Sequence, residues 1–435
     1  MNQLLIKRIA QLKNSEIPTG YKKTELGVLP SDWTIVSLGE LLVFQNGVNV
    51  AKEKYDSGVK MISVMDILGD SPIYYDCIRG QVDIDGDTLK KYEVTYGDLL
   101  FLRSSETVED AGIANVYLDR RGATFSGFVI RGKKNAQYEP YYLNKSLQNQ
   151  QTRKQIIRNA AGTQHFNIGQ ASLNRVLVPF APSSEQAKIA EILMTWDKAI
   201  ELHKQQIEKL KQFKSVCLKK MFPAKGQTVP EWRFKGFTDV WEQRKLGEMG
   251  TTFTGLSGKV KEDFGHGDAR FVTYMNVFTN PVSDPTRVEA VEIDKSQNVV
   301  QYGDVFFTTS SETSEEVGMS SVWLENTENT YLNSFCFGYR PTEKIDPHYM
   351  AYMLRSEAVR ERIIYLAQGI SRYNISKNGV MQTEVPLPNL AEQKLLGEYF
   401  CDLDNLITLH QRKVETYQKQ YRILQQYLLN GIVRV

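Results

Sequence analysis

The chain carries one long segment twice. Residues 96–118 read YGDLLFLRSSETVEDAGIANVYL, and residues 302–324 read YGDVFFTTSSETSEEVGMSSVWL; the two are identical at 12 of 23 positions and lie 206 positions apart. A spacing of 206 to 208 positions relates further residues along nearly the whole chain: Trp33 to Trp241, Gly162 to Gly369, Asn167 to Asn374, and Glu185-Gln186 to Glu392-Gln393. Solenoid repeats have shorter periods. The sequence therefore predicts two copies of one fold, related by pseudosymmetry.

Composition excludes several classes of protein. The 435 residues contain no apolar run near the roughly 20 needed to span a bilayer, so no membrane is expected. The N-terminus lacks the continuous apolar core of a secretion signal, and four widely spaced cysteines form neither a metal motif nor a disulfide framework. A cytoplasmic location is the expectation. The net charge is only +2, so a polyanion would have to be met by locally clustered basic residues.

Within each copy the local signals follow the same order. After the tryptophan, short β-branched and aromatic runs broken by Gly, Asp and Pro predict several strands. Tyr-Gly-Asp then precedes an apolar strand at 99–102 or 305–308, and a helix is expected to start near Pro140 or Pro347. A glycine loop follows, GTQHFNIGQ in one copy and GISRYNISK in the other. This order indicates an α+β fold in which each copy mixes helices and strands.

Each copy ends in a long amphipathic pattern. From Leu396 to Leu428 apolar residues recur in alternating steps of four and three, which is typical of a coiled-coil seam, and the first copy repeats the pattern 207 positions earlier. Lys214 breaks it, and Phe213 beside it is the candidate to take its place. Two seams in register favour mutual packing over separate packing on each globular part. The central seam positions are Leu193, Trp196, Ile200, His203, Ile207 and Leu210 in one helix, and Phe400, Leu403, Ile407, His410, Val414 and Tyr417 in the other.

An antiparallel pairing of the two helices about their midpoints would place the globular parts at opposite ends of a dumbbell. Each seam would be roughly 48 Å long at about 1.5 Å per residue. One turn of B-DNA is shorter, about 34 to 36 Å. His203 and His410 would share one layer, and we predict that this polar layer fixes the register, because no third ligand for a metal is evident.

A rigid spacer between two similar heads suits duplex DNA, which has its own dyad and offers two separated half-sites. The string GYKKTELGVLPSDWTIVSLGEL at 20–41, the two helix starts VPFAPSSEQ and VPLPNLAEQ, and the duplicated layout resemble the specificity subunit of type I restriction-modification enzymes. The resemblance covers essentially the whole chain. It implies two pseudo-symmetric mixed α/β target-recognition domains separated by two long helices that form an antiparallel coiled coil. The implied segments are an N-terminal arm with a short helix (1–30), the first recognition domain (31–182), the first long helix (183–222), a linker with the second recognition domain (223–389) and the second long helix (390–435).

The resemblance also implies the partners. They are double-stranded DNA, two methyltransferase subunits that bring S-adenosylmethionine, and restriction or motor subunits that use ATP and Mg. No cofactor is expected in this chain, which is not itself an enzyme. Its sequence agrees, because it contains no G-x-x-x-x-G-K-(S/T) phosphate loop and no Asn-Pro-Pro or Asp-Pro-Pro run.

The duplication also suggests which residues read DNA. Two heads that read different half-sites should share their framework and differ where they touch base edges. Asn167 and Asn374 are shared, so they fix a loop or meet phosphate. The shared Ser-Ser-Glu-Thr at 104–107 and 310–313 favours a structural loop, although its glutamate could accept a bond from cytosine N4.

The divergent positions at the glycine loop hold residue types that suit base readout, since Gln pairs with adenine and Arg with guanine. The stretches 44–92 and 251–297 diverge most, and basic residues there would anchor phosphates. The candidate DNA-binding residues are Gln164, His165, Phe166, Asn167, Arg103, Asn46, Asn49, Lys52 and Lys54 in the first copy, and Ser371, Arg372, Tyr373, Asn374, Lys259, Lys261 and Arg270 in the second.

Two other classes of function remain open at this point. A structural or adhesion protein with duplicated binding heads on a coiled-coil stalk would not retain DNA. A stand-alone nuclease would need a cluster of acidic residues and lysine, and the sequence offers no such pattern.

Overall fold

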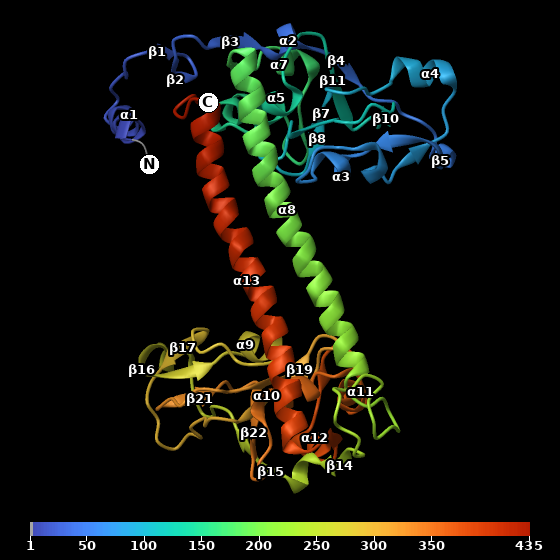
Figure 1. The fold of residues 1–435 in the computed structure, drawn as a ribbon, viewed down its shortest axis with the longest axis vertical. Helices are drawn as coiled ribbons and strands as arrows, with labels where there is room; N and C mark the ends of the chain where they lie inside the picture. The colour runs from blue at the N-terminus through green and yellow to red at the C-terminus, as the bar shows by residue number, and fades with distance from the viewer. Residues whose placement is uncertain (1–2) are drawn as a thin grey trace. The chain divides into compact units, whose positions relative to one another are not determined.

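A computed structural model describes residues 3–435, which divide into two compact units (Figure 1). Unit 1 comprises the chain up to His203 together with Lys413–Val435, and unit 2 comprises Lys204–Arg412. The divisions fall inside the two long helices, so each unit contains part of both. The sequence had instead set the helices apart as segments of their own, 183–222 and 390–435.

Unit 1 is built around a four-stranded antiparallel sheet in the order β4-β11-β7-β9. A second sheet, β10-β5-β6, combines a parallel and an antiparallel pair. Three two-stranded pairs complete the unit: β1-β2, β3-β13 and β8-β12. The strands are β1 (Tyr21–Thr24), β2 (Gly27–Pro30), β3 (Thr34–Ser37), β4 (Leu42–Asn46), β5 (Tyr55–Ile62), β6 (Gln81–Val82), β7 (Leu99–Leu102), β8 (Ser104–Ser105), β9 (Ala114–Val116), β10 (Thr124–Phe125), β11 (Val129–Lys134), β12 (Phe166–Asn167) and β13 (Leu177–Phe180).

Helices cover the sheet edges of unit 1 and link its strands. The buried helix α5 begins at Pro140 as predicted, since proline is favoured in the first turn, where its missing N–H is not needed. The helices are α1 (Gln3–Lys13), α2 (Leu38–Leu41), α3 (Val64–Ile67), α4 (Gly86–Lys91), α5 (Pro140–Leu147), α6 (Gln150–Arg158), α7 (Gln170–Asn174) and the first part of α8 (Ser183–Lys220).

Unit 2 repeats this plan. Its four-stranded sheet has the order β15-β22-β18-β20, and its second sheet, β17-β16-β21, again contains one parallel pair. The predicted fold class, two copies of a mixed α/β domain, is confirmed. The elements are β14 (Glu242–Lys245), β15 (Gly250–Thr254), β16 (Phe264–Val272), α9 (Tyr274–Thr279), β17 (Val288–Val291), β18 (Val305–Thr308), β19 (Ser310–Ser311), β20 (Ser320–Val322), β21 (Thr330–Leu332), β22 (Cys336–Pro341), α10 (Pro347–Met353), α11 (Glu357–Ile364), β23 (Tyr373–Asn374), α12 (Lys377–Met381), β24 (Glu384–Leu387) and the first part of α13 (Leu390–Leu429).

The shared Tyr-Gly-Asp forms a tight turn that leads into β7 and β18. Gly97 and Gly303 have φ of 90° and 87°, in the left-handed region that favours glycine. Each aspartate closes its turn, because Asp98 Oδ2 accepts from Thr95 N at 2.9 Å and Asp304 Oδ2 from Gln301 N at 2.7 Å. The predicted turn is confirmed in both units.

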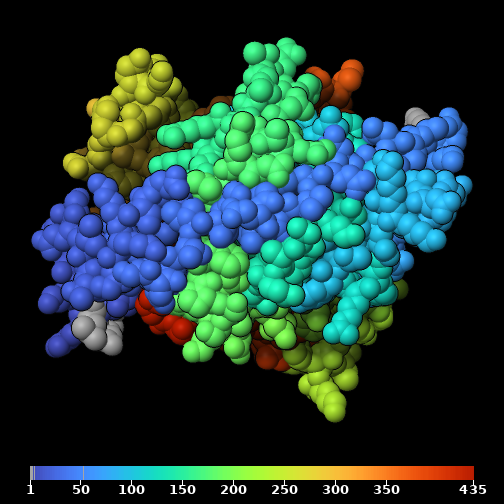
Figure 2. Space-filling view, turned by 90° about the horizontal axis from the view of Figure 1, so that it is seen from above, coloured from blue at the N-terminus to red at the C-terminus, as the bar shows by residue number. Residues whose placement is uncertain are grey.

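The two ends of the chain meet within unit 1. The hydroxyl of Tyr21 donates to Gly431 O at 2.6 Å, and Arg434 bonds both Asp32 and the buried Glu185. Figure 2 shows the N-terminal segment, in blue, crossing the face of unit 1 that this view presents. The hairpin β1-β2 therefore ties the N-terminal arm to the end of the chain.

The long helices α8 and α13 pack against each other in both units, and their pairing is antiparallel. In unit 1 the rings of His203 and Trp196 each lie 5.6 Å from that of Tyr417, and the hydroxyl of Tyr421, further along α13, donates to Asp197 at 2.7 Å. In unit 2 Lys214 meets Asp404 and Cys217 meets Tyr399, so positions again rise along α8 as they fall along α13.

The seam positions are largely buried. The aliphatic members and Phe400 are at most 9% exposed, and Trp196, His203, His410 and Tyr417 are half-buried. The layer proposed for His203 and His410 joins residues of different units and stays a prediction.

The expectation for Phe213 is wrong. Phe213 is 46% exposed, and Lys214 keeps the seam position. The Lys214 side chain is only 17% exposed, its Nζ lies 2.5 Å from Asp404 Oδ1, and it rests 5.2 Å from the centre of the Tyr352 ring. Because its charge is paired there, the lysine can occupy a half-buried site.

The Glu-Gln pair at the start of each long helix anchors that helix. Glu392 is 1% exposed and accepts from Arg233 Nε and Nη2 at 2.7 and 2.8 Å, while Glu185 accepts from Trp33 Nε1 at 2.8 Å and from Arg434. Each arginine lies in the segment that follows the other long helix. The glutamine next to each glutamate accepts the backbone N–H of the residue that caps α5 or α10, at 3.0 Å in both units. The predicted helix start thus joins the long helix to the start of α5 or α10 and to the segment that follows the other long helix.

Candidate nucleic-acid interface

The glycine loop is a short closed hairpin in each unit. In unit 1 the backbones of Ala161 and Asn167 exchange two hydrogen bonds, of 3.0 and 2.8 Å, and in unit 2 Gln368 and Asn374 do the same at 2.9 Å. The first loop residue is glycine because its φ is 140° or 143° and an added Cβ would lie 1.9 or 2.0 Å from a carbonyl oxygen across the loop. The glycine and these bonds therefore fix the base of each hairpin.

The shared Ser-Ser-Glu-Thr segment holds the glycine loop by strand pairing. Strand β8 pairs with β12, and β19 pairs with β23, so the two serines of each copy bond the returning arm of the hairpin. This agrees with the structural interpretation of the segment. The Glu106 and Glu312 side chains are exposed.

The tips present the divergent residues. Gln164 and His165 in unit 1 are exposed, as are Ser371 and Arg372 in unit 2, while the aromatic residues Phe166 and Tyr373 that follow them are half-buried. The structure brings together four predicted residues in each unit.

The shared asparagines hold the loop from within. The amide of Asn167 donates to His165 O at 3.3 Å and that of Asn374 to Arg372 O at 3.5 Å. Of the two roles predicted for these asparagines, fixing a loop is the one these contacts support.

Arg103 in unit 1 and Thr309 in unit 2 connect each glycine loop to the turn that precedes β11 or β22. Arg103 N donates to Phe128 O at 3.0 Å, and Arg103 O accepts from Ile168 N at 3.0 Å. In unit 2 Thr309 makes the same two backbone bonds, to Phe335 O and from Ile375 N, each at 3.0 Å. The guanidinium of the half-buried Arg103 bonds Gly127 O at 3.3 Å, so this predicted residue also has a structural role.

Unit 2 has a groove beside its loop, with a volume of about 660 Å³. Apolar and polar side chains share it, which is the usual character of a ligand site. Ser371 and Arg372 of the loop tip line it, as do the apolar Met275 and Phe335, which the sequence analysis did not single out. Its lining residues are Tyr274, Met275, Phe278, Ser310, Ser311, Glu312, Glu316, Phe335, Ser371 and Arg372.

The predicted residues of the first divergent stretch have mixed placements. Asn49 lies against Gly127, where an added Cβ would come 1.7 Å from Asn49 Oδ1, so it neighbours the Arg103 turn. Asn46, at the end of β4, and Lys54 are exposed. The side chain of Lys52 lies outside the described part of the structure. Roles for these residues in DNA binding stay predictions.

In the second divergent stretch, two of the predicted basic residues are engaged within the protein. Lys259 Nζ lies 3.0 Å from Asp294 Oδ2, and this hydrogen bond raises the pKa of Lys259. Arg270 donates to the backbone carbonyls of Gly267 and Ala269 at 3.0 and 2.9 Å. Lys261 is exposed.

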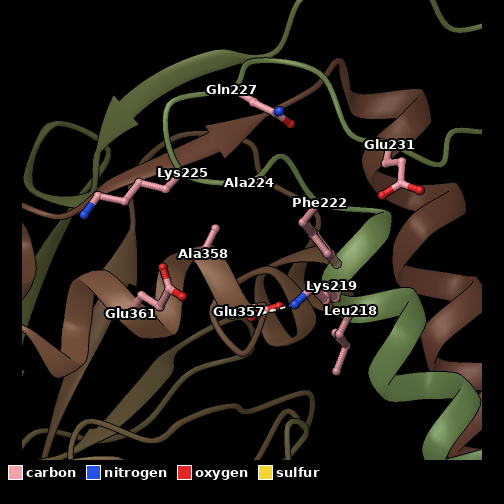
Figure 3. A pocket seen from close by; sticks show the side chains of 10 residues that line it. All are labelled: Leu218, Lys219, Phe222, Ala224, Lys225, Gln227, Glu231, Glu357, Ala358 and Glu361. Carbon is pink, nitrogen blue, oxygen red and sulfur yellow. Dashed lines mark hydrogen bonds and ion pairs between the residues drawn. The ribbon is translucent and has the colours of Figure 1, made fainter.

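A smaller pocket in unit 2, of about 380 Å³, lies where the end of α8 meets α11 (Figure 3). Two of its charged residues pair with each other: Lys219 Nζ lies 3.1 Å from Glu357 Oε1. We assign this pocket to the packing of the helix end. Among residues 3–435 no group of three or more His, Cys, Asp or Glu is arranged to hold a metal, and no helix is long and apolar enough to cross a membrane.

Comparisons with known proteins match this architecture. The model of the type I restriction modification DNA specificity domain matches residues 30–212 and again residues 238–416, the same two copies seen in the sequence. The putative type I restriction enzyme MjaX specificity subunit of Methanocaldococcus jannaschii is 26% identical over 444 residues, which cover 95% of this chain and 97% of the relative. The EcoKI specificity subunit of Escherichia coli is 25% identical over 278 residues, 62% of this chain and 56% of the relative.

Solved structures share the fold. The S subunit of a type I restriction-modification system from M. genitalium superposes with a TM-score of 0.56 at 14% identity, covering 91% of this chain and 96% of that one. The family model spans most of the chain in two matches. This chain therefore belongs to the type I restriction modification DNA specificity family.

Proposed function

We propose that this chain is the DNA-recognition subunit of a type I restriction-modification complex and that each unit reads one half of a bipartite site. The observation that carries the proposal is the pair of glycine loops. The two loops have the same hairpin bonds, the same glycine and the same supporting strand, yet their exposed tips differ. A shared frame with divergent tips is what two heads for two different half-sites require.

The chemistry of the tips suits readout in the major groove. An arginine such as Arg372 can donate two bonds to guanine O6 and N7, and a glutamine such as Gln164 can pair with adenine N6 and N7. The net charge of only +2 gives a weak general attraction to phosphate, so partner subunits are proposed to supply part of the phosphate clamp.

The partners and cofactors follow from the family and belong to the same proposal. Two methyltransferase subunits would dock on this chain and bring S-adenosylmethionine, and restriction or motor subunits would bring ATP and Mg. The chain itself would be non-catalytic and would direct their action to its site.

The test uses the full chain, alone and with its methyltransferase subunits, to select duplexes from a random library. We expect a bipartite consensus. The Arg372→Ala variant should relax one half of it, and Gln164→Ala the other, each by roughly 5- to 150-fold for the preferred base. Lys235→Ala, which removes an exposed cation of the linker, is the control and should leave the consensus unchanged.

Two results would overturn the proposal. The first is no retention of duplex DNA by the chain or its complex, as a protein-binding or adhesion role predicts. The second is a consensus that both loop variants leave intact.

A further inference from the structure

Each unit exposes two large apolar side chains at equivalent positions. Met65 is 76% and Phe128 66% exposed in unit 1, and Met275 is 51% and Phe335 58% exposed in unit 2. The methionine is the second residue of α3 or α9, and the phenylalanine directly precedes β11 or β22. Scattered exposed apolar residues are ordinary. The recurrence of the same two residue types at the same two positions needs an explanation. We call Met65 with Phe128, and Met275 with Phe335, the apolar pairs.

The backbone of each phenylalanine takes part in the fold, whereas its side chain does not pack. The carbonyls of Phe128 and Phe335 accept the bonds from Arg103 N and Thr309 N that hold the glycine loops, each at 3.0 Å. The rings themselves point outward, as their exposure shows. Because packing does not account for the phenylalanine side chains, their recurrence indicates contact with something that both units meet.

The apolar pairs lie beside the loops. In unit 2 Met275 and Phe335 line the same groove as Ser371 and Arg372 of the loop tip. In unit 1 Ser126 N donates to Ile62 O at 3.0 Å, which brings the turn of Phe128 next to the residues that lead into α3 and Met65. In unit 2 a molecule held in this groove against the loop tip would therefore also meet the apolar pair.

The charges of the groove indicate which part of DNA fits there. Two carboxylates, of Glu312 and Glu316, and one cation, of Arg372, line it, so the negative charges outnumber the positive one; Glu316 accepts from Ser311 Oγ at 3.2 Å. Two carboxylates repel phosphate but accept bonds from base amino groups. The apolar pair in this groove therefore suits base faces, thymine methyl groups and deoxyribose.

We propose that the apolar pairs are DNA contacts, one per unit, that each head makes next to its reading loop whatever half-site it reads. The inference rests on the proposed function. Because the pairs are the same in two heads with different tips, they add affinity that depends little on sequence, whereas the tips select the base. Apolar contacts of this kind carry no charge, so they add nothing to the salt dependence of binding.

The test measures the affinity of the full chain, alone and in complex with its methyltransferase subunits, for its selected duplex and for unrelated duplexes. We expect Phe335→Ala and Phe128→Ala each to weaken binding to all duplexes by about 5- to 30-fold, the range that partial loss of a buried aromatic contact supports. The slope of log K against log salt and the selected consensus should stay unchanged, and Phe335→Leu should recover part of the affinity. Tyr302→Ala and Tyr96→Ala are matched controls. These tyrosines are also shared and exposed, at 52% and 48%, but they precede the start of β18 and β7, whereas the residues that contact the loops follow the ends of these strands.

The outcomes separate this inference from the proposed function. If Phe335→Ala binds DNA like the unchanged chain while Arg372→Ala alters the consensus, the proposed function stands and the apolar contact is disproved. If the phenylalanine variants lose co-purification with the methyltransferase subunits instead, the pairs are a protein-docking surface and the inference is wrong. If neither class of variant affects DNA binding, both proposals fail.

Discussion

Asp98 and Asp304 occupy the same turn in the two units but have different partners. Asp304 is 1% exposed and accepts from Arg340 Nε and Nη2, both at 2.7 Å, whereas Asp98 accepts only from the backbone N–H groups of Thr95 and Lys134 and the hydroxyl of Thr95. Removing one member of a buried ion pair leaves the other charge unpaired. We therefore expect Asp304→Asn to lower the free energy of unfolding by about 2 to 4 kcal/mol and Asp98→Asn by about 1 to 2 kcal/mol, measured by urea denaturation. Equal costs would contradict this assignment of partners.

The same aspartate gives a prediction for pH. Burial raises the pKa of Asp98 above its ordinary value of 3.8, against the backbone N–H groups of Thr95 and Lys134, which lower it. The stability that the protonated carboxyl contributes is complete below 3.8 and is lost as the pH rises through the raised pKa of the folded state. The cost of Asp98→Asn in the free energy of unfolding should therefore be greatest in acid and shrink as the pH rises. Denaturation curves across this range would contradict the prediction if the cost stayed constant or grew.

In each unit an aspartate on one long helix contacts a lysine and a tyrosine. The lysine comes from a short helix in unit 1 and from the other long helix in unit 2, and the tyrosine comes from the other long helix in unit 1 and from a short helix in unit 2. In unit 1 Asp197 meets Lys145 of α5 at 2.9 Å and Tyr421 of α13 at 2.7 Å, and it also accepts from the hydroxyl of Tyr141 of α5. In unit 2 Asp404 meets Lys214 of α8 at 2.5 Å and Tyr352 of α10 at 2.9 Å. Each aspartate keeps one cation. The exchange therefore favours the pairing of α8 with α13, because a helix paired with its own kind would place either two lysines or no lysine beside the carboxylate.

The exchange can be tested by moving the lysine. Lys214→Tyr leaves Asp404 between two tyrosines, so we expect the free energy of unfolding to fall by about 2 to 4 kcal/mol. Adding Tyr352→Lys in the same chain gives Asp404 a lysine from the short helix and a tyrosine from the long helix, as Lys145 and Tyr421 do for Asp197, and should recover most of that loss, measured by thermal and urea unfolding. A double variant as unstable as the sum of the two single variants would disprove the equivalence.

The sequence predicted elements well where the duplication or a period marked them. The strands after Tyr-Gly-Asp, the helices at Pro140 and Pro347 and the two long helices lie where the patterns placed them. It did not find the Arg233 and Arg434 contacts, because each arginine lies in the segment after a long helix and these two segments do not align between the copies. It also missed Phe128 and Phe335, since the pattern of residue types does not distinguish an exposed ring from a buried one, and the Lys259–Asp294 pair, since its members lie far apart in the sequence.

One chain holds two related units, and we propose that their loops meet different halves of a DNA site. The Glu-Gln anchors and the Asp-Lys-Tyr groups give the two units the same internal frame, while the exposed loop tips carry different residues. The set of methylated sites that depends on the chain would therefore report its function.

The most direct measurement is a genome-wide map of methylated adenines in cells that carry the chain, in cells that lack it, and in cells whose chain carries Arg372→Ala. We expect a bipartite methylated motif that disappears when the chain is deleted and that changes in only one of its halves in the variant. Methylation that is the same with and without the chain, or a variant that alters both halves together, would contradict it.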